Sequence, residues 1–142
     1  MPPAPVGVTD RRMGDDLRIN IRVPSATTRV PVYQKALEFA ARVFTVIELA
    51  ASVERYFLRD QLDRKSTAVP QLVAQGLATD NMPQRRQLLE RARRMVTDCG
   101  AILDTLGERG TVEPEALDAA RVATGGLAEV LHELVTPPPK VW

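Results

Sequence analysis

The segment ERYFLRDQLDRKSTAVPQLVAQG, residues 54–76, decides the fold of this chain. Its apolar residues recur at the three- and four-residue steps of an amphipathic helix. The inward face consists of Leu58, Leu62, Val69, Leu72 and Val73. Pro70 lies deep inside this pattern, where a proline removes a backbone hydrogen bond and costs about 3 kcal/mol. We therefore predict one long helix, capped by Ser52 and ending near Ala78, with a packing reason for its proline.

The composition favours helices packed around an aliphatic core. Of the 142 residues, 44% are hydrophobic but only 4% are aromatic, which suits close helix packing better than a β-sandwich. The single cysteine, Cys99, excludes an internal disulfide framework and a cysteine-rich zinc site. No apolar run approaches the roughly 20 residues that span a membrane, and the N-terminus lacks a signal-peptide pattern. These features predict a cytoplasmic protein without membrane contact.

Three further helices are predicted around this segment. One runs from about Val32, just after Pro31, to Ala50. Another begins at the Asp80–Pro83 turn and continues to Leu106, with Cys99 on its buried face and Gly107 and Gly110 ending it. The last begins around Pro114 and is stopped by Pro137–Pro139. Short connections predict an all-α fold, an antiparallel up-down four-helix bundle over residues 31–135.

The ends of the chain lie outside the predicted bundle. Residues 1–30 form a Pro-rich extended arm, in which residues 17–23 alternate between apolar and polar side chains like a lone strand. Such a strand would pair with another subunit or a partner, whereas an irregular arm with accidental alternation fits equally well. Residues 136–142 form a Pro-rich tail.

Four motifs in residues 33–76 resemble a known family. They are Y-Q-K-A (33–36), E-R-Y-x-L (54–58), Q-L-x-R (61–64) and V-P-x-x-V-A-Q-G (69–76). This order resembles the small four-helix-bundle proteins encoded by intervening sequences of bacterial 23S rRNA genes. The accessory variability determinants of diversity-generating retroelements share that fold. The resemblance covers roughly residues 31–135 of this chain. Leu72 and Gln75 depart from the Asn and Glu that the family carries there.

The resemblance also implies an assembly and partners. Members of this family form barrel-shaped homopentamers, which predicts a ring, most simply a pentamer, for this chain. The retroelement accessory proteins are thought to bind nucleic acid and a reverse transcriptase through basic surfaces. The resemblance therefore implies RNA or DNA, or a reverse transcriptase, as partners of this chain.

Basic residues are concentrated in the middle of the chain. Residues 51–95 contain nine Lys or Arg against five Asp or Glu, whereas residues 96–142 contain three against eight. Arginine suits bidentate phosphate contact, so this surface is a candidate for nucleic-acid binding. A protein-facing or merely solvated surface is the alternative. The predicted nucleic-acid-binding residues are Arg59, Arg64, Lys65, Arg85, Arg86, Arg93 and Arg94. Asp98 is expected to neutralise either Arg91 or Arg94 on the same ridge.

Two adjacent glycines, Gly125 and Gly126, interrupt the last predicted helix. Together they lower helix stability by roughly 2 kcal/mol, which suggests the close approach of another helix, such as one from a neighbouring subunit. We predict that the subunit interface includes these glycines together with Tyr56 and Pro70.

No catalytic constellation is recognisable in this sequence. Glu129 and His132 have the Glu-x-x-His spacing of di-iron bundles, but His132 is the only histidine and the other buried faces offer no carboxylates. No metal, cofactor or catalytic residue is predicted. The sequence therefore predicts a non-enzymatic, oligomeric accessory protein that binds nucleic acid or a reverse transcriptase. The alternative is a structural or protein-interaction adaptor that docks a partner through the 17–23 strand or the C-terminal tail.

Overall fold

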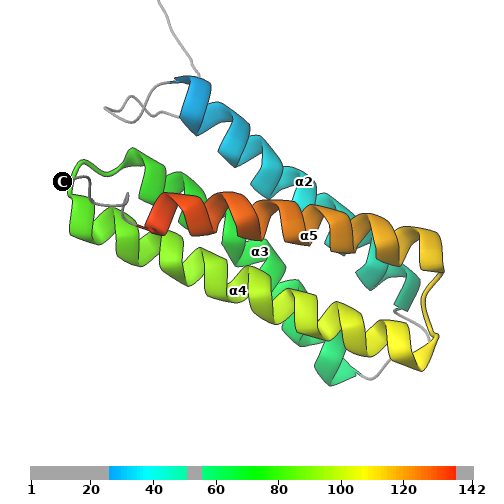
Figure 1. Cartoon of the computed structure of the whole chain (residues 1–142). Coiled ribbons are helices and arrows are strands. Elements are labelled where there is room, and N and C mark those ends of the chain that lie inside the picture. Colours follow the sequence, from blue (N-terminus) through cyan, green and yellow to red (C-terminus); the bar gives the residue numbers. More distant parts are fainter. Residues whose placement is uncertain (1–25, 51–55, 137–142) are drawn as a thin grey trace, which may run out of the picture.

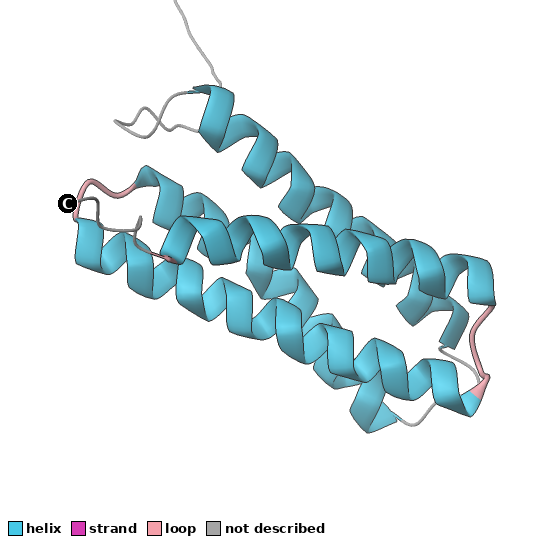
Figure 2. Cartoon of the chain, viewed as in Figure 1, coloured by secondary structure: helices cyan, strands magenta, loops and turns pink. Residues whose placement is uncertain are grey.

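The computed structural model describes residues 26–50 and 56–136, and the side chains of residues 30–50 and 57–136. Four antiparallel helices make up this part of the chain (Figures 1 and 2): α2 (Ala26–Ala50), α3 (Tyr56–Ala78), α4 (Met82–Arg109) and α5 (Pro114–Val135). Helix α2 packs against α3 and α5, and α4 packs against the same two helices from the other side. The predicted all-α four-helix bundle is confirmed.

The core runs the length of the bundle and is aliphatic, as the composition indicated. Leu62, Val69, Leu72 and Val73 of α3 are buried as predicted, and Leu58 packs against the core half-buried. Phe39 of α2 is fully buried among them. Leu72, which stands where the family has Asn, is thus a core residue of its own bundle. It stabilises the monomer instead of offering a polar group to a neighbour.

Helix α2 begins earlier than its sequence pattern predicted. It starts at Ala26, so Pro31 is its sixth residue and lies inside the helix. Only the first few N–H groups of a helix lack intrahelical partners, so a proline at this position removes the backbone hydrogen bond to the carbonyl of Thr27. The predicted boundary between arm and bundle at residue 31 therefore falls within a helical turn. The 17–23 strand, Ser52 and Pro137–Pro139 lie outside the described residues.

The two described turns use different chemistry. Asn81 caps α4, because its side-chain oxygen accepts a 2.9 Å hydrogen bond from the backbone N–H of Gln84. At the other end Gly110, with φ of 67°, adopts the left-handed conformation that closes a helix. The prediction that Gly107 ends the helix is wrong, because α4 continues to Arg109. Gly107 instead allows close packing of α5, since a Cβ there would lie 3.0 Å from Leu117 Cδ2.

The helix that contains Pro70 packs tightly against α4. Pro70 is buried within the bundle, and its missing N–H leaves the carbonyl of Ser66 without its usual helical donor. Two turns further on, a Cβ at Gly76 would lie 2.9 Å from both Cγ and Cδ2 of Leu89 on α4. The segment that defines the resemblance, 69–76, is therefore the line along which α3 and α4 make close contact.

Candidate functional site

The basic residues of α3 are largely neutralised by acids of the same chain. Arg64 pairs with Asp60 at 2.8 Å, one helical turn away. Lys65 reaches across to α4 and pairs with Asp98 at 3.1 Å. The prediction that Asp98 neutralises Arg91 or Arg94 is therefore wrong, because the packing of α3 on α4 brings Lys65 to this carboxylate. Arg59 is half-buried and is also engaged in an interaction.

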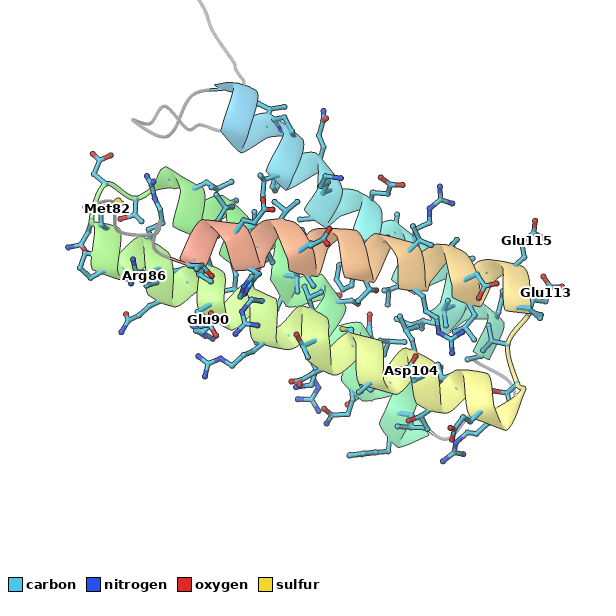
Figure 3. The ribbon with its side chains drawn as sticks, viewed as in Figure 1. Met82, Arg86, Glu90, Asp104, Glu113 and Glu115 are labelled. Atoms are coloured by element: carbon cyan, nitrogen blue, oxygen red, sulfur yellow. The ribbon has the colours of Figure 1, made fainter. Side chains whose placement is uncertain are left out.

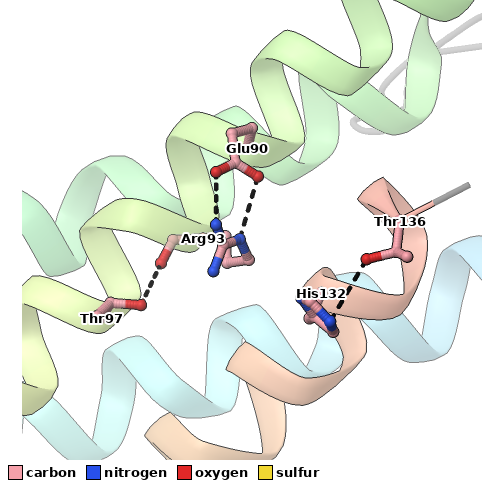
Figure 4. Close-up of polar contacts among 5 residues, drawn as sticks. All are labelled: Glu90, Arg93, Thr97, His132 and Thr136. Atoms are coloured by element: carbon pink, nitrogen blue, oxygen red, sulfur yellow. Dashed lines mark hydrogen bonds and ion pairs between the residues drawn. The ribbon is translucent and has the colours of Figure 1, made fainter.

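Two of the predicted arginines of α4 also form hydrogen bonds within the chain. Arg93 donates two hydrogen bonds to Glu90, at 2.6 and 3.1 Å, from one turn further along the helix (Figure 4). These hydrogen bonds from Arg93 hold the pKa of the Glu90 carboxyl below its usual value, so Glu90 stays ionised. Arg85 folds back to the α3–α4 turn and donates to the carbonyl of Thr79 at 2.9 Å. Both guanidinium groups are thus committed to local structure.

Three arginines remain exposed on one face of α4. Within the described part of the chain, Arg86, Arg91 and Arg94 have no hydrogen-bond or ion-pair partner. All three line a shallow groove of about 910 Å³ along the N-terminal half of α4, together with Met82, Leu88 and Glu90. The positive charge of Arg94 also helps to lower the pKa of the Glu90 carboxyl, after the hydrogen bonds from Arg93. Figure 3 shows Met82, Arg86 and Glu90 in order along this part of the helix. We call Arg86, Arg91 and Arg94 the arginine face.

Of the predicted nucleic-acid-binding residues, the structure places Arg86 and Arg94 on the arginine face and commits the others to internal contacts. Arg91 also belongs to the face, although it was not among the predicted nucleic-acid-binding residues. Its position five residues after Arg86 and three before Arg94 is compatible with one broad helical face. That spacing is the signal that could have identified it.

Acidic side chains gather at the opposite end of the bundle. Figure 3 shows Glu113 and Glu115 at the start of α5 and Asp104 in the second half of α4, far along the bundle from Arg86. Arg121 of α5 bridges two of the acids there, bonding Asp104 at 3.2 Å and approaching Asp118 at 3.6 Å. The uneven charge of the sequence is therefore an uneven charge in space.

The predicted interface residues fall in different environments. Pro70 is buried in the chain's own bundle, so its ring is not available to another subunit. Tyr56 is the first residue of α3, and its side chain lies outside the described residues. Apart from the adjoining backbone of α5, a Cβ at Gly125 or at Gly126 would have no atom of the described residues within 4 Å. No helix of this bundle therefore accounts for the two glycines.

The remaining chemistry-bearing residues form no site in the described ranges. Cys99 is fully buried, as predicted, and burial raises the pKa of its thiol to about 12. His132 lies on the surface near the end of α5, beside Thr136 (Figure 4). Residues 26–50 and 56–136 contain no group of three or more His, Cys, Asp or Glu that could hold a metal ion. None of the four helices is long and apolar enough to cross a membrane.

The fold and the sequence motifs agree with a comparison against known families. Residues 28–133 match the profile of the family described as 23S rRNA-intervening sequence protein, which is well over half of the chain. The chain belongs to this family. Among solved structures, the chain is similar to a protein of unknown function from the S23 ribosomal protein family of Bacteroides thetaiotaomicron.

That structure superposes with a TM-score of 0.69 at 15% sequence identity, over 76% of this chain and 97% of the other. At this identity the likeness establishes the fold. No curated protein matches the sequence at a significant level. The relationship to the accessory proteins of retroelements stays a prediction.

Proposed function

We propose that this protein is a non-enzymatic, homo-oligomeric accessory protein that binds nucleic acid through the arginine face of α4. The observation that supports the proposal is the division among the basic residues. Arg64, Lys65 and Arg93 are paired with carboxylates, whereas Arg86, Arg91 and Arg94 have no such partner among the described residues. Arginines left free in this way can each contact a phosphate, and they lie along one groove.

The geometry favours contact with the phosphate backbone over reading of bases. The groove is shallow, and its described lining contains no aromatic side chain on which a base could stack. Phosphate contact from arginines is independent of base sequence and sensitive to salt. A structured RNA or a duplex is therefore the expected class of ligand. A reverse transcriptase as an additional protein partner stays a prediction.

The test compares two variants of equal charge change. In the first, Arg86, Arg91 and Arg94 are replaced by Gln; in the control, Arg64, Lys65 and Arg93 are replaced by Gln. Fluorescence anisotropy of a labelled RNA hairpin and of a DNA duplex is measured over a range of salt concentrations. Each lost phosphate contact on duplex DNA lowers the slope of log K against log salt by about 0.9, so the first variant should lower it by up to about 3.

The control variant should leave the slope close to that of the wild type, because its side chains already neutralise acids of the chain. Circular dichroism verifies that both variants stay helical. Equal binding by the wild type and the first variant would refute the arginine face as the binding surface. Loss of binding in the control alone would move the surface to the paired residues Arg64 and Lys65 of α3 and Arg93 of α4.

A further inference from the structure

Helix α2 has a second apolar face that the bundle leaves uncovered. Phe39 and Val43 lie on its buried face. Val30, Tyr33, Leu37 and Phe44 follow the spacing of a coiled-coil seam on another side of the helix, and all four are exposed. Phe44 and Leu37 keep 57% and 45% of their surface in solvent. We call these four residues the α2 stripe. Large apolar residues grouped in this way are typical of a protein interface.

A groove suited to such a stripe lies on the other flank of the same helix. It runs between α2 and α5 and has a volume of about 540 Å³. Its floor is made by small side chains of α5, and its rim carries charges. The floor and wall include Ala119, Val122, Ala123, Gly126 and Leu127, and the rim includes Lys35, Glu38, Arg42 and Asp118.

The glycine on the groove floor is unexplained within a single chain. Glycine in the middle of a helix lowers its stability, and apart from the adjoining α5 backbone no described atom lies within 4 Å of a Cβ built at Gly126. Val122, one turn earlier on the same wall, is the most exposed of the large hydrophobic residues described, at 76%. A bulky apolar side chain seated in the groove would explain both the missing Cβ and the exposed valine.

The unpaired charges beside the stripe and the groove are opposite in sign. Of the rim charges, Glu38 pairs with Arg42 and Asp118 pairs with Arg121. Glu48 lies one turn beyond Phe44, toward the C-terminal end of α2. Lys35 lies on the groove rim, and in the described part of the chain neither residue takes part in an ion pair. An acid beside the stripe and a lysine beside the groove favour the joining of these two surfaces over the joining of two stripes.

We propose that the α2 stripe of one copy docks into the α2–α5 groove of the next copy. This proposal specifies the interface of the homo-oligomer and rests on that part of the proposed function. Because the stripe and the groove are different surfaces of one chain, the contact is heterologous. Repetition of a heterologous contact closes a ring or extends a filament. No residue of the arginine face lines the α2–α5 groove or belongs to the α2 stripe, so the two proposed surfaces are separate.

Two variants test the two halves of the contact separately. Leu37→Glu combined with Phe44→Glu removes the stripe, and both sites are exposed, so the core is untouched. Gly126→Leu fills the groove and replaces a poor helix former with a good one, so the monomer should fold at least as well as the wild type. Ala101→Glu, on an exposed site of α4, is the control for an added surface charge.

The masses of the purified full-length proteins are measured by light scattering and sedimentation, without nucleic acid. The wild type and the Ala101→Glu control should form the same closed assembly, whereas each interface variant should have the mass of the monomer, 15.7 kDa. Mixing the two interface variants should restore one interface, because each retains the half that the other lacks. The mixture should therefore give a species of twice the monomer mass and nothing larger.

Three results would overturn the proposal. A Gly126→Leu variant that assembles like the wild type would show that the groove is not used. A mixture of the two interface variants that stays monomeric would show that stripe and groove do not join. A wild-type protein that is monomeric at high micromolar concentration would show that the chain does not self-assemble. Assembly without nucleic-acid binding, in contrast, would refute only the arginine face.

Discussion

The contact between Gly76 of α3 and Leu89 of α4 makes a sharp prediction about stability. A Cβ at residue 76 would lie 2.9 Å from Leu89 Cγ and Cδ2 and 3.4 Å from Leu88 Cβ, and ordinary contact begins at 3.4 Å. Leu89 is 1% exposed, so its side chain cannot move into solvent. The Gly76→Ala variant must therefore displace Leu89 or the helix by roughly 0.5 Å, the difference between 2.9 and 3.4 Å.

Two opposing effects set the size of the change. Overpacking a core typically costs about 1–3 kcal/mol, and the upper half of this range applies because two atoms of a buried leucine are involved. Gly76 lies in the last turn of α3, where replacing glycine with alanine favours the helix by at most about 1 kcal/mol. We therefore expect Gly76→Ala to lower the free energy of unfolding by about 1–3 kcal/mol.

Gly125→Ala is the matched control, because its Cβ meets no atom of another described helix within 4 Å. This variant should raise the free energy of unfolding of the monomer by up to about 1 kcal/mol. Urea denaturation followed by circular dichroism measures both variants, in the background that removes the α2 stripe so that assembly does not contribute.

The Gly76→Ala effect should also depend on its neighbour. In a Leu89→Ala background the obstructing atoms are absent, so the same substitution should become neutral or stabilising. A double-mutant cycle would then show a coupling of at least about 1 kcal/mol. A Gly76→Ala variant as stable as the wild type, or a cycle without coupling, would refute the close approach of α3 and α4 at this point.

Three further predictions follow from single contacts. Asn81→Ala removes the acceptor for the Gln84 N–H and should lower the free energy of unfolding by about 1 kcal/mol in urea titrations, whereas Asn81→Asp should not. The buried Cys99 thiol, with its pKa raised from 9.0 to about 12, should react with a maleimide at pH 8 at least about a hundredfold more slowly in the native protein than in urea; equal rates would contradict its burial. Glu90→Gln removes the carboxylate that pairs with Arg93. Nucleic-acid binding, measured by anisotropy, should become tighter and its dependence on salt steeper. Weaker binding would contradict the role of the arginine face.

Much of the fold could be predicted from local sequence, because helix period and capping are local properties. The spacing of Leu62, Val69 and Val73 identified the buried face of α3, and Asn81 followed by Pro83 identified the start of α4. The glycines were harder to separate. Gly110 ends α4 through its positive φ, whereas Gly107 lies within the helix beneath Leu117 of α5. Only the position of the neighbouring helix distinguishes the two roles.

The candidate site was less predictable, because the charge state of a surface depends on which helices meet. Asp98 shares a ridge of α4 with Arg91 and Arg94, yet it pairs with Lys65, which is 33 residues earlier and on α3. That one pairing leaves two arginines of α4 free and removes a lysine from the predicted surface. Sequence spacing ranks contacts within a helix, whereas the packing of α3 on α4 decides between them.

The glycines of α5 connect the stability of the monomer with the proposed assembly. Gly125 and Gly126 together lower helix stability by roughly 2 kcal/mol, and none of the described helices α2, α3 and α4 occupies the space they leave. A large side chain at position 126 would therefore stabilise an isolated monomer while obstructing the groove. If the groove receives the α2 stripe of a neighbouring copy, that contact offsets the lost helix stability. A substitution of Gly126 by a large residue must then raise the stability of the monomer and lower that of the assembly. A substitution at Gly126 that raised the stability of both the monomer and the assembly would mean that this glycine has no role in the contact between copies.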